Sequence, residues 1–402
     1  MSRKKKKLLI VLAVILIGFG AVFAYSHFVN NDIHYVSGQD QIPDNTKDSR
    51  VKNANDTIAP VSSIAQAPVT HIETPSVVKA LYASSWVAGS SKYINPLIEL
   101  IDATELNAIV IDVKDSTGRI SFPVSDPVVE QYGSVERRIS DIRGLTHRLH
   151  QKNIYIIGRI SVFQDPYLAP KKPEWAITKK SDGKVWKDKK GLSFLDPANK
   201  EVRAYVAALA RDAYEQGFDE INFDYIRYPS DGNITDINYH LTDGKTRADN
   251  LESFFAYLSG EMKKEKNIPI SADLFGLTTE LSDDMGIGQV WEKALPHFDY
   301  LSPMIYPSHY PAGTHGYKNP AAYPYEIIDA ALKGAIAKTK AAGQDIKKIR
   351  PWLQDFNLGA TYTKEMVRAQ IKASNDNGIT SWMLWDPKNK YTPAALEVEK
   401  GQ

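Results

Sequence analysis

From residue 77 onward the sequence predicts an α/β fold, specifically a (β/α)8 TIM barrel. Runs rich in β-branched and aromatic residues alternate with amphipathic segments eight times, which indicates parallel strands joined by helices. Residues 77–402 leave room for eight such units with loop insertions, since these barrels typically take about 250 residues. A doubly wound open sheet is the alternative. However, "SSWVAGSSKY" follows the first run, where a dinucleotide-binding sheet would have G-x-G-x-x-G.

The expected elements follow one another in strict alternation. We expect strands at 79–86, 108–115, 154–161, 221–228, 269–276, 300–307, 349–356 and 380–387. Helical patterns lie between and after them, at 94–105, 141–153, 200–217, 246–266, 288–296, 325–343 and 363–378. Gly217, Gly343 and Gly378 close three of these patterns, as glycines commonly do at helix ends. The carboxyl ends of all strands then meet at one face, where barrels of this kind carry their function.

The overall composition excludes several classes of function. Lys and Arg number 49 against 48 Asp and Glu, so no basic field indicates a nucleic-acid partner. The absence of cysteine excludes disulfides, zinc–thiolate sites, iron–sulfur clusters and a cysteine nucleophile. The sequence contains no Walker lysine loop, no H-E-x-x-H and no G-x-S-x-G. We therefore expect no cofactor and no metal, and nothing predicts an oligomeric state.

The first 76 residues predict a membrane attachment and a spacer. In residues 1–29, "MSRKKKK" precedes an apolar run at 8–24, which predicts a signal anchor with the chain beyond it outside the cytoplasmic membrane. The length of the run favours a single-pass anchor over a signal cleaved after Ala24, which would give a secreted protein. Residues 30–76 are rich in Asn, Asp, Ser, Thr and Pro and predict a flexible linker. The folded domain is expected at 77–402.

Two carboxylates near the strand ends predict glycoside hydrolysis. That reaction needs one carboxyl group that protonates the leaving oxygen and a second that attacks or activates water. Asp224 is the candidate for the ionised partner, because Arg227 and Arg159 are near enough in the chain or the barrel to keep it charged. Asp273, next to Leu and Phe on the following strand, is the candidate acid.

Further polar and aromatic residues fall at the same ends of the strands. Asp355 or Asp386 could replace Asp273 as the acid or bind sugar hydroxyls, and either could instead be a buried structural carboxylate. Aromatic rings suit the apolar faces of pyranose sugars. We expect Trp352 and Trp382 to fill the barrel core. The predicted substrate-binding residues are Asp112, Arg159, Arg227, Tyr306, His309, Trp86, Trp385 and Asp386.

Other features have more ordinary interpretations. Asp219 and Glu220 lie at the start of their strand and are expected to be solvated or capping groups. His147 and His150 are expected on a helix surface or in packing. The basic insertion at 171–199 is expected to lie over the mouth of the cleft, where its charge would favour an anionic glycan.

The run "GFDEINFDYIRYPSDG", with the preceding "LDPANKEVRAYVAALARDAYEQ", resembles the bacterial family described as "putative glycosyl hydrolase domain". The similarity extends from about Val77 to about Ala395 and includes the shorter matches "VKD", "GRISVF", "SPMIYPSHY" and "PWLQDF". The resemblance implies a TIM barrel related to the α-amylase-like glycosidases. By position it implies Asp224 as nucleophile, Asp273 as proton donor and Asp355 as stabiliser. The family's donor is usually Glu, and here Glu280 lies further into the loop.

The predicted function is therefore an extracytoplasmic glycoside hydrolase that acts on a cell-surface or extracellular polysaccharide. One alternative is a catalytically silent, membrane-tethered glycan-binding barrel, which the lack of a Glu donor favours. The other is a metal-dependent hydrolase. Only His309 among the histidines falls at a predicted strand end, which counts against that alternative.

Overall fold

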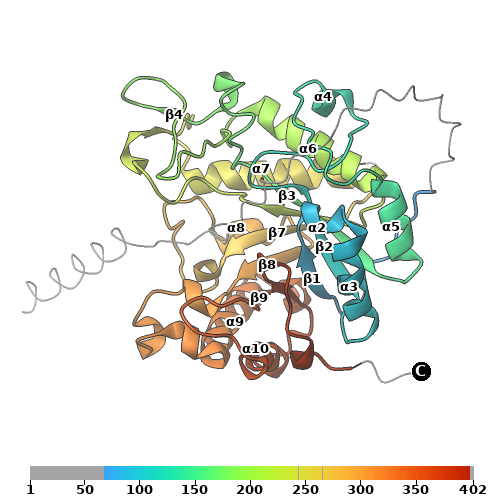
Figure 1. Cartoon of the computed structure of the whole chain (residues 1–402). Helices are drawn as coiled ribbons and strands as arrows, with labels where there is room; N and C mark the ends of the chain where they lie inside the picture. The colour runs from blue at the N-terminus through green and yellow to red at the C-terminus, as the bar shows by residue number, and fades with distance from the viewer. Residues whose placement is uncertain (1–67, 243, 265, 399–402) are drawn as a thin grey trace, which may run out of the picture. The chain divides into compact units, whose positions relative to one another are not determined.

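The computed structural model describes residues 68–242, 244–264 and 266–398, and within them eight parallel strands close into a barrel (Figure 1). Around the barrel the strands follow the order β1-β10-β9-β8-β7-β5-β3-β2. Their bounds are β1 Lys79–Ala83, β2 Ala108–Lys114, β3 Tyr155–Ser161, β5 Glu220–Asp224, β7 Ile270–Phe275, β8 Tyr300–Met304, β9 Trp352–Gln354 and β10 Trp382–Trp385. Each predicted strand overlaps one of these, so the predicted (β/α)8 barrel is confirmed.

Helices surround the barrel and return the chain from one strand to the next (Figure 1). Thr246 begins α7 with a capping box to Asp249, and Asn199 caps α6, which fixes where these two helices start. The helices are α2 Ser85–Ala88, α3 Ser91–Asp102, α4 Pro127–Glu130, α5 Ile142–His150, α6 Lys200–Glu215, α7 Arg247–Lys263, α8 Trp291–Ala294, α9 Pro324–Ala341 and α10 Lys364–Asp376. Short 3-10 turns are η1 Pro173–Trp175, η2 Ile234–Asp236, η3 Gly276–Thr279, η4 Pro307–His309, η5 Thr314–Gly316, η6 Pro320–Ala322, η7 Ile346–Lys348 and η8 Pro393–Ala395.

Most strands end earlier than predicted, and β1 and β5 do so for a clear local reason. β1 stops at Ala83 because the side chain of Ser84 accepts the N–H of Val87 and starts α2. β5 stops at Asp224 because Tyr225 adopts φ 48°, a left-handed conformation that no strand continues. Trp86 and Arg227 therefore lie on the connections beyond the strands rather than within them.

The strands bury both of their faces. β2 and β3 are buried along their whole lengths, as expected for parallel strands enclosed by helices. Outward side chains such as Ile109 and Ile111 pack beneath the helices in the larger apolar cluster. The barrel interior contains Val78, Ala80, Tyr82, Ala108, Val110, Tyr155, Ile157, Tyr306, Trp352 and Met383.

A buried ion pair closes the amino end of the barrel, and it corrects our expectation for Glu220. Its carboxylate pairs with Arg350 at 2.5 Å, and both side chains are fully buried. Glu220 also accepts hydrogen bonds from Ser271 Oγ at 2.5 Å and from the Tyr155 hydroxyl at 3.2 Å. It is not solvated, because alternation along β5 directs it inward together with Asn222 and Asp224.

Asp219 is also buried, and it attaches the segment at 68–76 to the barrel. Its carboxylate accepts the backbone N–H of Ile72 at 2.7 Å and that of Ile156 at 2.8 Å, and it contacts His150 Nε2 at 3.0 Å. Thr74 bonds to the hydroxyl of Tyr155 at 2.8 Å. Residues 72–74, which we expected to belong to the linker, therefore lie against the amino end of the barrel. Asp219 was expected to be a solvated or capping group. It is not solvated, and it accepts two backbone N–H groups.

The predicted anchor at 1–29 and the predicted linker up to residue 67 lie outside the described residues. Within the described part of the chain, no helix has the length and apolar character needed to cross a membrane.

The loops after β3 and β5 join into a small antiparallel sheet. β4 (Thr178–Lys179) pairs with β6 (Ile237–Asn238), and both loops follow carboxyl ends of barrel strands. Trp186 is buried there and donates its indole N–H to the carbonyl of Asn233 at 2.9 Å, and Trp175 is buried as well. The tryptophans of the 171–199 insertion thus pack inside it, while lysines such as Lys187 stay exposed.

Candidate active site

An arginine between two aspartates lies at the carboxyl ends of β2, β3 and β5. Arg159 donates from Nη1 to Asp112 at 2.6 Å, and from Nη2 and Nε to Oδ2 of Asp224 at 2.5 and 3.1 Å. All three side chains are buried. Although burial opposes the charge of Arg159, Asp224 and Asp112 raise the pKa of its guanidinium, so it stays a cation. The structure thus brings these three predicted residues together.

Asp224 has a second fixed contact, and this contact comes from a strained residue. Oδ1 accepts the backbone N–H of Tyr225 at 2.6 Å. Tyr225 holds φ 48°, which is uncommon for a residue with a bulky side chain and often marks a functional site. Arg227 donates to the carbonyl of Tyr228 at 3.0 Å, and its guanidinium lies 4.6 Å from the Phe275 ring centroid. The cation that pairs with Asp224 is therefore Arg159, from the preceding strand.

Asp273, on the neighbouring strand, has a different environment. It is 1% exposed, and its Oδ1 accepts hydrogen bonds from Asn222 Nδ2 at 2.9 Å and from Trp352 Nε1 at 2.7 Å. Burial, and then the charge of Asp224, raise the pKa of Asp273 well above its ordinary value, while Arg159 opposes the rise. Asp224 therefore bonds to the Arg159 cation, while Asp273 is the carboxyl group of the pair whose pKa is raised.

Aromatic rings surround these acids. Tyr82 donates its hydroxyl to Asp112 at 2.6 Å and stacks on Trp385 with ring centroids 4.0 Å apart. Trp385 meets Trp352 edge-on at 5.5 Å, and the Arg159 guanidinium lies 5.1 Å from the Trp385 ring. The predicted residue Trp385 thus belongs to this wall, and so does Trp352, which is buried in the barrel core as expected.

Tyr306 and His309 continue the wall from the end of β8. Tyr306 packs in the barrel-interior cluster with Tyr82 and Trp352, which both bond to the acids. Burial, and then the charges of Asp273 and Asp224, raise the pKa of Tyr306 well above its ordinary value. His309 packs edge-on against Tyr306 at 5.2 Å. Both predicted residues therefore lie beside the acids.

Asp355 and Asp386 form a separate group at the ends of β9 and β10. The two carboxylate oxygens of Asp355 accept the N–H of Thr392 at 2.8 Å and its hydroxyl at 2.7 Å. Asp386 accepts the N–H of Lys388 at 2.6 Å. Burial raises the pKa of each carboxyl to about 6, and the charge of Asp355 adds to the effect on Asp386. These contacts fix the segment after β10, and a role in catalysis or sugar binding stays a prediction.

Sequence reasoning missed four residues of the site. Tyr82, Asn222 and Trp352 bond to the predicted aspartates. Tyr391 donates to the carbonyl of Tyr82 at 2.5 Å, which attaches the segment after β10 to β1. Alternation along the strand placed Asn222 on the same face as Asp224. The other contacts depend on barrel closure and leave no local sequence signal.

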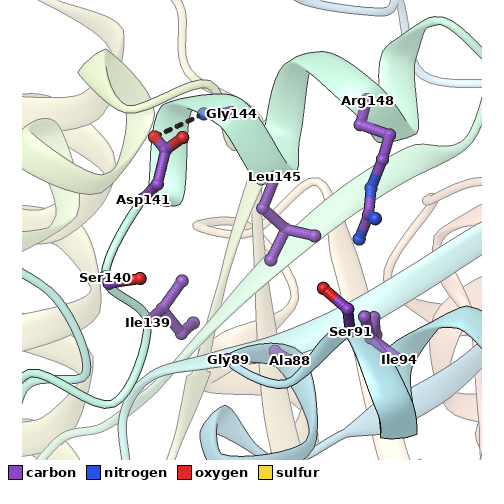
Figure 2. Close-up of a pocket in the computed structure, with 10 residues that line it drawn as sticks. All are labelled: Ala88, Gly89, Ser91, Ile94, Ile139, Ser140, Asp141, Gly144, Leu145 and Arg148. Atoms are coloured by element: carbon purple, nitrogen blue, oxygen red, sulfur yellow. Dashed lines mark hydrogen bonds between the residues drawn. The ribbon is translucent and has the colours of Figure 1, made fainter.

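Two surface pockets of the described chain lie away from these acids. One, of about 290 Å³, lies between the loop after β1 and the start of α5 (Figure 2). The other, of about 490 Å³, lies between Tyr239 and Val290. In the described part of the chain, no three His, Asp or Glu side chains converge as metal ligands would.

The family model described as "Putative glycosyl hydrolase domain" matches residues 80–391. The chain belongs to this family. It is thereby classed with the glycoside hydrolases, as the resemblance implied. A comparison with curated protein sequences found no match.

Solved structures with a similar fold include other barrels. A hypothetical protein from Ruminiclostridium thermocellum is 34% identical, with a TM-score of 0.44, over 48% of this chain and 96% of that one. The PgaB (BpsB) glycoside hydrolase domain of Bordetella bronchiseptica is 11% identical, with a TM-score of 0.58, over 80% of this chain and 99% of that one. The α-galactosidase of Thermus thermophilus in complex with stachyose is 12% identical, with a TM-score of 0.50, over 80% of this chain and 63% of that one. At 11–12% identity the last two share the fold alone.

Proposed function

We propose that this chain hydrolyses glycosidic bonds in a cell-surface or extracellular polysaccharide by a two-carboxylate mechanism. The observation that carries the proposal is the contrast between two acids on neighbouring strands. Asp224 accepts two hydrogen bonds from Arg159, whereas Asp273 is buried and has a raised pKa. Glycoside hydrolysis requires one carboxyl group that donates a proton and a second that is ionised.

Asp273 acts as the general acid. Asn222 and Trp352 both donate to its Oδ1, so the proton of the neutral acid lies on Oδ2, the oxygen that meets the glycosidic oxygen. The raised pKa of Asp273 favours its protonated form. The acid can therefore protonate the leaving group as the bond breaks.

Asp224 acts as the nucleophile or as the base that activates water. Arg159 and the N–H of Tyr225 hold its carboxylate in one orientation. Tyr225, whose N–H makes this contact, has a left-handed φ of 48°. Tyr82 and Trp385 supply stacked ring surface beside the acids, suited to the apolar faces of a sugar.

The test is the release of reducing ends from a panel of α- and β-linked glucose, galactose and N-acetylglucosamine polysaccharides. Asp224→Asn is expected to lower kcat by about 1000-fold or more, and Asp273→Asn by about 100- to 10,000-fold. Asp376→Asn, on the outer helix α10, is the control and should leave kcat unchanged. Full activity of D224N would overturn the proposal. Binding of a glycan without cleavage by the unaltered protein would support the silent-barrel alternative instead.

The proposed location is outside the cytoplasmic membrane. The basic residues before the apolar run at 8–24 support it. Protease added to intact cells should degrade the domain at 77–402, and full protection of the domain would contradict this location.

A further inference from the structure

An exposed tryptophan lies on the short helix α2, which follows β1, and a fixed arginine supports it from one side. Trp86 is 59% exposed, and the guanidinium of Arg138 lies 4.8 Å from its ring centroid. Arg138 donates to Asp115 at 2.5 Å, to Glu136 at 2.7 Å and to Ser85 Oγ at 3.1 Å. Its own side chain is 3% exposed. The cation under the ring is therefore immobilised.

This arrangement fits a binding platform better than ordinary packing. An indole that only stabilised the fold would gain most by burying its ring, since buried apolar area is what contributes free energy. Here one face contacts a cation that two carboxylates and a hydroxyl hold in place, and much of the ring stays in water. A rigid, exposed indole loses little conformational entropy when a ligand stacks on it.

A pocket opens close by in the sequence, between the end of α2, the start of α3 and the start of α5 (Figure 2). A Cβ on Gly89 would lie 2.0 Å from the carbonyl oxygen of Arg138, so the loops touch at the edge of the pocket. The pocket measures about 290 Å³, and its lining begins two residues after Trp86 and one residue after Arg138. Its polar lining residues are Ser91, Ser140, Asp141 and Arg148, and its apolar base includes Ile94, Ile139 and Leu145.

Platform and pocket lie on the same barrel face as the acids, but outside their immediate surroundings. Trp86 follows Tyr82 of the acid cluster by four residues, so their Cα atoms are at most about 14 Å apart. Asp115, which holds Arg138, follows Asp112 by three residues. A single sugar bound at the acids would not cover both places. A chain of sugars could extend from one to the other.

We propose that Trp86 and this pocket form a remote subsite, which binds a pyranose unit of the polysaccharide several units away from the bond that is cleaved. The ring face stacks on the exposed indole, and a substituent of the same or the next sugar enters the pocket near Ser140 and Asp141. The inference rests on the proposed function and adds that the substrate is a long chain bound at more than one place. Arg138 is a positioning residue, which acts through Trp86.

The experiment compares malto-, cello-, galacto- and chito-oligosaccharides of two to eight units. Trp86→Ala should raise KM about tenfold for the longest cleaved oligosaccharide and leave kcat and the KM of the shortest unchanged. Ser140→Trp, which fills the exposed edge of the pocket, should do the same. Arg138→Lys should give a smaller rise in KM. Tyr93→Ala is the matched control, because this aromatic is 55% exposed on α3 and does not line the pocket.

Binding is measured separately by calorimetry in the Asp224→Asn background, so that the two proposals fail independently. The subsite is supported if affinity increases with the length of the oligosaccharide in D224N and no longer increases with length when Trp86→Ala is added. If W86A and S140W bind and cleave long and short oligosaccharides as the unaltered protein does, the subsite is overturned while the role of Asp224 stands. If D224N still cleaves, the proposed function fails and the calorimetry alone decides on the subsite. Absence of binding to every oligosaccharide overturns the subsite.

Discussion

The hydrogen bond from Trp352 to Asp273 affects the pH range over which Asp273 stays protonated. Burial and Asp224 raise the pKa of Asp273, while the hydrogen bonds from Asn222 and Trp352 oppose the rise by stabilising its ionised form. In the proposed mechanism the rate depends on a protonated Asp273, so it should fall as the pH rises through the pKa of this group. Trp352→Phe removes one opposing bond, so the alkaline limb of the kcat profile should move to higher pH.

The pH–rate profiles of W352F and the unaltered protein measure this shift. Trp382→Phe is the matched control, since this indole is also buried and its Nε1 has no hydrogen-bond partner. An alkaline limb that stays in place in W352F, or that moves equally in W382F, would contradict the role of this bond.

At the scale of an element, the segment after β10 depends on two carboxyl groups with raised pKa values. Asp355 and Asp386 titrate near pH 6 in the folded protein and near the ordinary 3.8 when unfolded. Between these values the folded state binds more protons, so stability falls as the pH rises from about 4 to 6. A shift of this size corresponds to at most about 3 kcal/mol for each group.

Asp386→Asn should remove the contribution of one of these two carboxyl groups to the pH dependence of stability. Relative to the unaltered protein, the variant should gain stability between pH 4 and pH 7, measured as the free energy of unfolding in urea. Asp283→Asn, an exposed acid on the loop after β7, serves as the control. An equal pH dependence in D386N and the unaltered protein would show that this carboxyl does not titrate as described.

The elements could be predicted from the sequence because each carries its own local pattern, while the contacts of the site could not. The strand at Glu220–Asp224 was found by its apolar alternation, yet its end was misplaced because nothing local marks the left-handed Tyr225. Glu220 was misjudged because its partner Arg350 is 130 positions away. That Asp224 and Asp273 lie on neighbouring strands could be predicted, because barrel topology brings successive strand ends together. The indole that bonds Asp273 belongs to a strand 79 positions later.

At the scale of the whole molecule, the segment at 68–76 closes the amino end of the barrel. Its removal would leave Asp219 without the N–H of Ile72 and Tyr155 without Thr74. A chain that begins at residue 77 should therefore unfold at lower urea than one that begins at residue 68. We expect a loss of about 2–4 kcal/mol, from two or three hydrogen bonds and a partly uncovered carboxylate. Thr74→Val, which removes one hydroxyl, should lose about 1 kcal/mol. Equal stability of the two chains would contradict this role.

Both ends of the described chain lie at that same face of the barrel. Ile72 bonds beside the start of β5, and the carbonyl of Glu397 accepts the N–H of Glu105, which follows the last turn of α3. The acids lie at the opposite ends of the strands. A bead, an electrode or a fluorescent protein fused at either end would therefore sit behind the barrel. The face that carries the acids would stay clear of the fused partner, which makes the domain suited to immobilisation through either end.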